Sequence, residues 1–136
     1  MSKVLKLYIS HSEVDSFEVD DAGVVLDKNY GKDENRAILV TTTNSYEIAK
    51  QNGIEADFGA LGENILIDVD IYHLKPTDRF KIGGALFEVT QNCTMCKSLA
   101  KIDSKLPKLL KNDRGIFVTL VSQKSKINLG DEVIVL

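Results

Sequence analysis

The chain has 136 residues and a formal net charge of −3, with 43% hydrophobic and 27% charged residues. This composition is ordinary for a globular protein of one domain. No stretch of about 18 apolar residues is present, and residues 1–10 lack the apolar core of a secretion signal. Two cysteines are too few for a disulfide framework. We therefore expect a single domain over residues 1–136, in the reducing cytoplasm and without membrane contact.

Charge is unevenly distributed along the chain. Residues 97–126 carry eight Lys and Arg against Asp103 and Asp113, a net charge of +6. A basic segment of this kind attracts anions and can lower the pKa of a nearby thiol; the alternative is a solvated helix face. No aromatic residues are interleaved with the lysines, so we do not predict a nucleic-acid partner.

Short β-branched and aromatic runs predict a protein made mainly of strands. In chain order, the expected strands cover residues 4–9, 17–19 (an edge strand), 23–26, 37–42, 65–69, 79–82, 85–90, 116–121 and 132–136. Gly83 and Gly84 separate two alternating runs, which indicates a tight hairpin. Seven or eight short strands with few helices are typical of an all-β barrel or sandwich.

Helices are expected in two places. Residues 45–52 form the first, because Asn44 can cap its start with Glu47 three residues later, as in a capping box, and Gly53 is suited to its end. Two short helical turns follow the cysteines, over residues 96–102 and 105–110, with Pro107 near the start of the second.

The only two cysteines, Cys93 and Cys96, form a C-x-x-C segment at the end of a predicted strand. This spacing supplies only two of the four ligands of a structural zinc site, and neither His11 nor His73 lies at recognisable ligand spacing from the pair. A dithiol that exchanges disulfides is a second interpretation, and a pair of inert core residues is a third. The fourth is a reactive or metal-ligating thiolate, which the following lysines would favour.

Three other segments carry chemistry that can bind a ligand. The loop Gly62-Glu63-Asn64 offers close backbone approach and an amide that both donates and accepts, which suits a polar cofactor edge; otherwise Asn64 simply caps the next strand. Arg36 and Arg114 each precede a strand and could hold a phosphate in a bidentate grip. No P-loop, dinucleotide fingerprint, zincin or nucleophile-elbow motif occurs.

The order of these pieces resembles the MOSC domain, the family named after the C-terminal domain of molybdenum cofactor sulfurases. The resemblance covers about residues 36–136 well and the first 35 loosely, and it is most specific in the L-G-E-N loop, in the T-Q segment leading to C-x-x-L, and in the closing G-D-E-V. The segments that carry it are residues 59–65 (G-A-L-G-E-N-I), 78–83 (D-R-F-K-I-G), 88–91 (E-V-T-Q), 96–99 (C-K-S-L), 114–117 (R-G-I-F) and 128–133 (N-L-G-D-E-V).

The resemblance implies a mainly β, barrel-like fold with a few short helices, and binding of the molybdenum cofactor, a pyranopterin that bears a phosphate. Cys96 matches the family's cysteine, a molybdenum ligand or a sulfur-accepting thiol. The cofactor-binding residues implied are Arg36, Gly62, Glu63, Asn64, Cys96 and Arg114. Relatives commonly carry G-D-x-H upstream of the arginine, where this chain has Leu26-Asp27-Lys28-Asn29, and proline where Met95 stands.

Two functional hypotheses follow. The first is a small molybdenum-cofactor protein, either a reductase module or a sulfur carrier. As a reductase it would need an electron-transfer partner, because the chain has no flavin or iron–sulfur motif; as a carrier it would need a cofactor or sulfur donor protein. The second is a cofactor-free thiol protein in which Cys93 and Cys96 receive a persulfide or cycle as a disulfide. The sequence leaves open whether the protein is an enzyme, and whether it carries the cofactor as purified.

Overall fold

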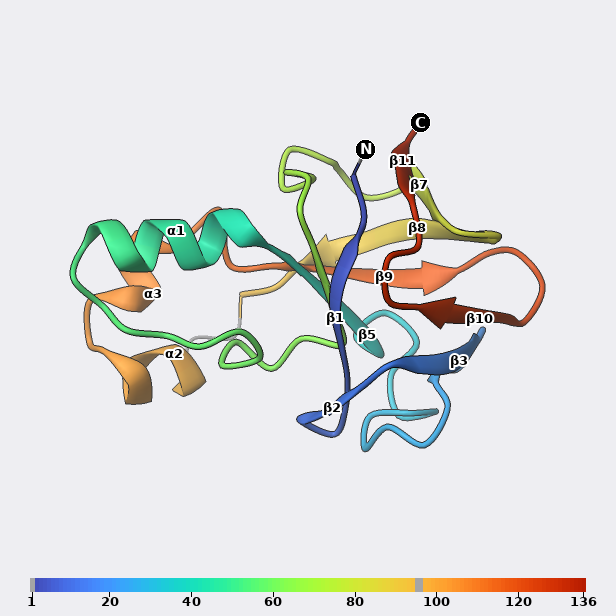
Figure 1. Cartoon of the computed structure of the whole chain (residues 1–136), viewed down its shortest axis with the longest axis horizontal. Helices are drawn as coiled ribbons and strands as arrows, with labels where there is room; N and C mark the ends of the chain where they lie inside the picture. Colours follow the sequence, from blue (N-terminus) through green and yellow to red (C-terminus); the bar gives the residue numbers. More distant parts are fainter. Residues whose placement is uncertain (1, 95–96) are drawn as a thin grey trace.

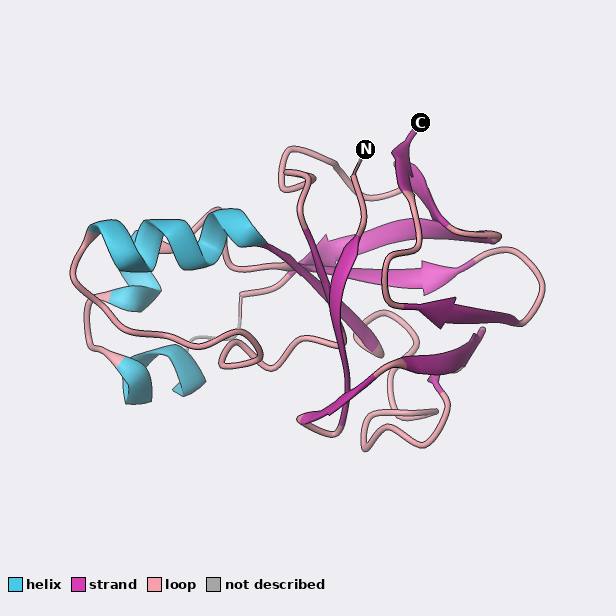
Figure 2. Cartoon of the chain, in the orientation of Figure 1, coloured by secondary structure: helices cyan, strands magenta, loops and turns pink. Residues whose placement is uncertain are grey.

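The computed structural model describes residues 2–94 and 97–136. Strands dominate the described residues (Figure 2). They are β1 (Val4–Ile9), β2 (Ser12–Val14), β3 (Ser16–Asp20), β4 (Gly23–Val24), β5 (Ile38–Thr42), β6 (Ile65–Ile67), β7 (Arg79–Ile82), β8 (Ala85–Asn92), β9 (Ile116–Leu120), β10 (Ser125–Asn128) and β11 (Val133–Val135). The helices are α1 (Thr43–Gln51), α2 (Lys97–Ile102) and α3 (Leu106–Leu109).

The larger sheet has eight strands in the order β11-β7-β8-β9-β5-β6-β1-β2. Its two sides meet again, because a β-bridge joins Lys3, just before β1, to Glu132, just before β11. Backbone hydrogen bonds from Val4 N to Asp131 O and from Val133 N to Ser2 O, both 2.9 Å, reinforce that junction. The two ends of the chain therefore lie side by side (Figure 1). This curled sheet confirms the expected mainly β, barrel-like fold.

A smaller sheet, in the order β10-β3-β4, packs against the barrel. In β3 the buried Phe17 and Val19 alternate with the exposed Glu18, so one face of this sheet joins the main core. The same alternation in β7 buries Phe80 and exposes Lys81. The period of two in β3 and β7 thus turns their apolar side chains into the main core, to which both sheets contribute.

Helix α1 is the crossover between the parallel strands β5 and β6, a connection that a hairpin cannot make. The expected cap at Asn44 is wrong: the helix begins two residues earlier and Thr42 caps it, its hydroxyl accepting from the Asn44 N–H at 3.2 Å. The predicted ending is confirmed, because Gly53 follows the C-cap residue with φ +72°.

The three helices gather at one end of the molecule, away from β3 and β10 (Figure 1). Their apolar side chains form a second buried cluster with the loop and strand beneath them. Its members are Tyr46, Ala49, Ile54, Leu61, Leu66, Leu99, Leu106 and Leu110. The predicted turn at 105–110 corresponds to α3, and the predicted turn at 96–102 corresponds to α2 from Lys97 onward; its first residue, Cys96, lies outside the described residues.

Several boundaries differ from expectation, and two strands were not expected, β2 and β10. The strand predicted at 23–26 ends at Val24, because Leu26 has a φ of +75° and is exposed. Strand β10 was not predicted at all, since Ser125 to Asn128 carry only one apolar residue, Ile127. It forms only because Ile127 pairs with Phe17 across the sheet. A cross-strand partner far away in sequence leaves no local signal.

Candidate functional site

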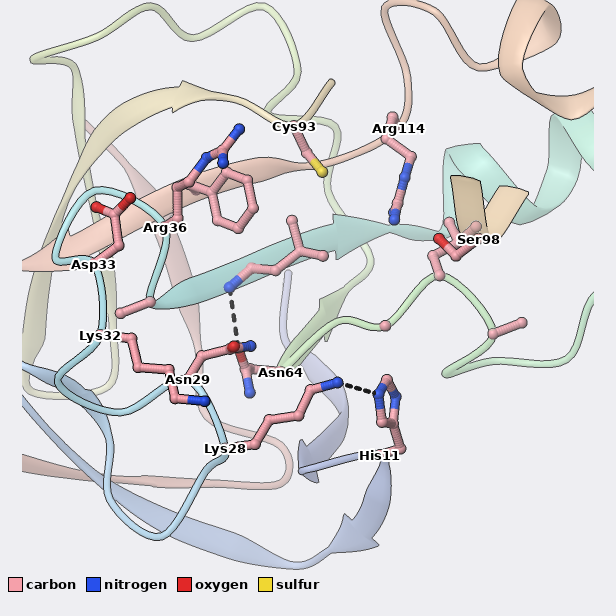
Figure 3. Close-up of a pocket in the computed structure, with 16 residues that line it drawn as sticks. His11, Lys28, Asn29, Lys32, Asp33, Arg36, Asn64, Cys93, Ser98 and Arg114 are labelled. Atoms are coloured by element: carbon pink, nitrogen blue, oxygen red, sulfur yellow. Dashed lines mark hydrogen bonds between the residues drawn. The ribbon is translucent and has the colours of Figure 1, made fainter. Parts of the chain in front are cut away.

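A cavity of about 450 Å³ opens beside β5 and β9, where several loops and the start of α2 meet (Figure 3). Its walls come from segments far apart in sequence, and it is large enough for a cofactor-sized ligand. The lining residues are His11, Lys28, Asn29, Lys32, Asp33, Arg36, Ala37, Leu39, Ala60, Leu61, Gly62, Asn64, Cys93, Ser98, Arg114 and Phe117.

Positive charge dominates the lining. Four permanent cations, two lysines and two arginines, face a single carboxylate, that of Asp33. Lys28, Lys32 and Arg36 are exposed, whereas Arg114 is buried. Cations on the walls of a partly enclosed cavity concentrate negative charge, and arginine adds a fork suited to phosphate or carboxylate. The cavity therefore fits an anionic ligand.

His11 reaches the cavity from a strained turn. Ser10 and His11 join β1 to β2 with φ of +46° and +72°, in the left-handed region that is uncommon for residues other than glycine. Two hydrogen bonds hold the turn, from Ser10 N to Asp27 Oδ1 at 2.7 Å and from Lys28 N to Ser10 Oγ at 2.8 Å. The Lys28 Nζ atom then lies 2.9 Å from His11 Nε2. Strain held by surrounding contacts is a common property of binding sites.

Arg36 is positioned through the backbone of its loop. Its N–H donates to the Asp33 carbonyl at 2.9 Å, and the Thr90 hydroxyl lies 2.6 Å from the Asn35 carbonyl oxygen. That hydroxyl is also 3.1 Å from the Phe117 carbonyl oxygen, so it ties the loop to β8 and β9 together. Thr90 of the T-Q segment thus helps to hold the backbone next to Arg36 in place.

Asn64 connects three parts of the cavity wall. Its Oδ1 accepts from Leu39 N at 3.1 Å, and its Nδ2 donates to Tyr8 O at 3.2 Å and to Asp27 Oδ1 at 3.1 Å. Its backbone also bonds to Leu39 O and Tyr8 N, both at 2.9 Å. Asn64 lines the cavity, yet its amide is used to join β5, β1 and the loop that carries Lys28. Asn64 therefore supports the cavity wall, a structural role like that of the strand cap considered from the sequence.

Glu63 is not among the residues that line the cavity. It is 2% exposed, and its Oε2 accepts from the Thr41 hydroxyl at 2.7 Å and from the Tyr46 hydroxyl at 2.5 Å. Tyr46 in turn accepts from Gly59 N at 3.0 Å and from Leu61 N at 3.4 Å. Glu63 therefore fixes the loop that forms the cavity wall from behind.

Two tyrosines close to Glu63 have raised pKa values. Burial, then the charge of Glu63 and then that of Glu13, raise the pKa of Tyr8 to about 12. Burial, followed by the charge and the hydrogen bond of Glu63, raises the pKa of Tyr46 far above its ordinary value. Within the described residues, neither the Tyr8 hydroxyl nor Glu63 Oε1 has a hydrogen-bond partner, although both are buried. Charge and unpaired polar atoms are thus concentrated behind the loop.

The apolar part of the cavity surrounds Cys93. This thiol is 2% exposed and packs with Leu39 and Phe117. In Figure 3 its sulfur lies between Arg36 on one side and Arg114 on the other. Cys96, the predicted ligand or nucleophile, lies outside the described residues, so its role stays a prediction.

The segment Arg114-Gly115 brings the second arginine close to β5. Gly115 has a φ of +151°, and a Cβ at this position would lie 3.0 Å from Leu39 Cδ1 and 3.3 Å from Val40 O. A side chain would therefore push the segment away from the strand. The glycine explains why the arginine before it can be buried at the cavity wall.

Most of the exposed polar residues at the rim of the cavity have little signal in the sequence. Lys28, Asn29, Lys32 and Asp33 fall in a segment that the sequence marked only as a polar loop, and the positive charges that recur at positions 28, 32 and 36 were its one available signal. His11 had no signal, since only the fold brings the β1–β2 turn to the cavity. Among the described residues, no three His, Cys, Asp or Glu side chains are placed to share a metal ion. No described helix is long and apolar enough to span a bilayer.

Comparisons with known proteins identify the family of the fold. The model of the MOSC domain family matches residues 27–134. Among solved structures, YuaD from Bacillus subtilis has a TM-score of 0.83 at 19% identity, covering 98% of this chain and 94% of that one. YiiM from Escherichia coli has 0.71 at 19%, covering 100% and 70%, and YiiM from Geobacillus stearothermophilus has 0.68 at 20%, covering 99% and 73%. No curated protein sequence matches the chain.

Proposed function

The chain belongs to the MOSC domain family, and from this premise we propose that its cationic cavity binds the molybdenum cofactor. The observation that carries the proposal is the meeting of Arg36, Asn64 and Arg114, from three distant segments, around one cavity. The same cavity contains Cys93, three positions before the family cysteine Cys96.

The residues present fit a phosphate-bearing pterin. Two arginines and two lysines can balance the phosphate charge, and arginine can do so through paired N–H donors. Leu39 and Phe117 offer an apolar surface for a flat ring system. Gly62 adopts a φ of +81° on the wall, where the backbone can approach a ligand closely.

Each part of the site has a distinct task in this proposal. Arg36 and Arg114 hold the phosphate, and Lys28, oriented by His11, adds positive charge at the rim. Glu63 and Asn64 do not supply the main ligand contacts; they fix the walls through Thr41, Tyr46 and Leu39. Leu39 and Phe117 limit the access of water to the Cys93 side of the cavity.

Cys96 is the residue that we assign to the molybdenum or to sulfur transfer. Molybdenum favours a soft thiolate ligand, and neighbouring cations favour the deprotonated thiol. When bound, the cofactor would supply the atom-transfer chemistry of a reductase, with electrons from a partner protein; a carrier would instead accept sulfur or cofactor from a donor protein. In both cases the chain's own residues bind and orient the ligand that enters the cavity.

The alternative, a cofactor-free protein using Cys93 and Cys96 as thiols, has one observation in its favour. Cys93 lies in the cavity rather than in the main core, so a small sulfur donor that entered the cavity could reach it. Mass spectrometry after incubation with a cysteine desulfurase tests it. A persulfide on either cysteine, with no molybdenum in the protein, would favour this alternative over the first proposal.

The main test is the metal and pterin content after expression in a host that makes the cofactor. We expect molybdenum and pterin to co-purify, and Arg36→Ala to reduce occupancy at least about tenfold, since a hydrogen bond to a charged group is worth about 1.5–3 kcal/mol. Arg79→Ala is the matched control, because Arg79 is an exposed arginine paired with Glu88 outside the cavity. If neither molybdenum nor pterin co-purifies, and Cys96→Ser changes nothing on reconstitution, the proposal fails.

A further inference from the structure

The segment that contains helices α2 and α3 carries exposed positive charge that the proposed cofactor site does not use. We call this surface the lysine face; it consists of Lys97, Lys101, Lys105, Lys108 and Lys111, all exposed. The three ion pairs within the described residues join Lys6 to Glu13, Arg79 to Glu88 and Lys124 to Glu18. None of them uses the lysine face, so its charges remain available to a partner.

The lysine face has a fixed orientation. Leu99, Leu106 and Leu110 lie on the opposite side of the same helical segment and are buried in the second core cluster. The carboxylate of Asp103 is engaged locally, accepting from Lys105 N at 2.8 Å. The lysines therefore point outward from an anchored segment rather than from a loose tail.

Both ends of this segment reach the cavity. Ser98, in the first turn of α2, lines it, and so does Arg114, shortly after α3. Figure 3 shows the two residues on the same side of the cavity, with Arg36 and Lys32 on the other. A protein seated on the lysine face would therefore lie next to the cavity mouth.

A purely solubilising role does not explain this arrangement. The whole chain has a net charge of −3, so added positive charge brings it closer to neutrality rather than further from it. Lys97 and Lys101 are four residues apart on a helix, where like charges repel and destabilise it. Among the described residues, no ion pair with an acidic side chain offsets this repulsion.

The chemistry of the face favours an acidic protein over nucleic acid or membrane. Residues 97–111 contain no arginine and no aromatic side chain, the residues that read and stack on bases. None of the large exposed apolar side chains of the described residues lies in α2 or α3, so nothing there would enter a bilayer. Lysines without apolar neighbours are typical of a contact that is transient and sensitive to salt.

We propose that the lysine face docks an acidic surface of a partner protein beside the mouth of the cavity. The idea that this partner delivers electrons, sulfur or cofactor to the cavity rests on the proposed function, whereas the docking itself does not. Electrostatic attraction between the two faces would speed their encounter and fix their relative orientation.

The test uses the whole protein and a defined acidic probe, a synthetic peptide of alternating glutamate and glycine. We expect its binding to shift backbone amide NMR signals in residues 97–111, with affinity falling as salt is raised. The triple variant Lys101→Glu, Lys105→Glu, Lys108→Glu should weaken binding at least about tenfold. Replacing the same three lysines by glutamine should give an intermediate loss.

The matched control reverses three exposed lysines outside residues 97–111, Lys75, Lys81 and Lys126, and changes net charge by the same amount. We expect its affinity for the peptide to stay within about twofold of the wild type. Equal loss in this control, or signal shifts centred on Lys28 and Arg36, would overturn the proposal. So would tighter binding of a DNA duplex or of phosphatidylglycerol vesicles through the same lysines. Molybdenum content plays no part in this measurement, so its failure is distinguishable from failure of the proposed function.

Discussion

The two sides of the cavity are built in different ways. On the side of Glu63 and Asn64, polar groups are buried. They are bonded to the backbone of β1 and β5 and to the Tyr46 hydroxyl of α1. On the side of Lys28, Lys32 and Arg36, the side chains are exposed. The backbone of their loop is held by hydrogen bonds, and Lys28 Nζ contacts His11 Nε2. The first side maintains the shape of the cavity, and the second supplies its charge.

This difference separates stability from binding. Buried hydrogen-bonded groups are costly to remove, because the partners that remain cannot turn to water. Exposed cations contribute little to folding but remain free to meet a ligand. Substitutions on the side of Glu63 and Asn64 should therefore lower stability, whereas substitutions on the side of Lys28, Lys32 and Arg36 should weaken ligand binding and leave stability unchanged.

The largest effect is expected for Asn64→Ala. The change leaves Leu39 N, Tyr8 O and Asp27 Oδ1 without the amide that joins them, and an unmet buried polar group costs about 1–3 kcal/mol. We expect the free energy of unfolding to fall by about 3 kcal/mol in urea denaturation. Asn35→Ala, at an exposed asparagine of the rim loop, should change it by less than about 0.5 kcal/mol. Equal losses in the two variants would contradict the division between the two sides.

A smaller effect of known sign is expected for the tyrosines that flank Glu63. Tyr46→Phe removes the hydroxyl that donates to Glu63 and accepts from Gly59 N, so we expect a loss of about 2 kcal/mol. Tyr8→Phe removes a buried hydroxyl that has no partner within the described residues. It should leave stability unchanged or raise it by up to about 1 kcal/mol. Denaturation of both variants checks the pair, and a large loss in Tyr8→Phe would show that this hydroxyl has a partner.

Alkaline pH should weaken the buried side of the cavity. The folded-state pKa of Tyr8 is raised from 10.0 to about 12, so above pH 10 the unfolded chain loses a proton that the folded chain keeps. The stability contributed by this group is therefore complete below pH 10 and is lost as pH rises through 12. The raised pKa values of Tyr46 and Tyr72 act with the same sign.

Denaturation at a series of pH values, together with ultraviolet titration of tyrosine, measures this effect. We expect Tyr8→Phe to show a shallower loss of stability in this range. Glu63→Gln should lower the pKa of Tyr8 without returning it to 10.0, because burial is its largest cause and the charge of Glu63 comes second. An unchanged titration in Glu63→Gln would mean that the two groups are not electrostatically coupled.

Local patterns predicted the elements of this fold better than their assembly. The hairpin around Gly83 and Gly84 and the helix end at Gly53 follow from glycine turns, whose conformational needs are local. The cap at Thr42 was missed because Asn44 and Glu47 make an equally good capping box in sequence. Strand β10 was missed because its pairing with β3 spans more than a hundred residues.

The candidate site shows the same limit. The family resemblance pointed to Arg36, Gly62, Asn64 and Arg114, and all four line one cavity. It also pointed to Glu63, which lies behind the wall because its carboxylate is bonded to the hydroxyls of Thr41 and Tyr46. Lys28 and His11 depend on a strained turn held by Asp27, a contact that no local pattern records.

The smallest effect on stability, and the clearest contrast with Asn64, is expected at the cationic rim. The double variant Lys28→Ala, Arg36→Ala replaces two exposed side chains for which no ion pair is present among the described residues. Its free energy of unfolding should therefore stay within about 0.5 kcal/mol of the wild type.

Inorganic pyrophosphate should reveal what the rim does. An anion that binds only the folded state adds RT ln(1 + [L]/Kd) to stability, so pyrophosphate should raise the thermal midpoint of the wild type. The rise should disappear in Lys28→Ala, Arg36→Ala and persist in the triple reversal of the lysine face, because that surface lies outside the cavity lining. If the rim variant keeps the full rise, the anion binds elsewhere, and the exposed cations of the cavity are not the part of the molecule that recognises charge.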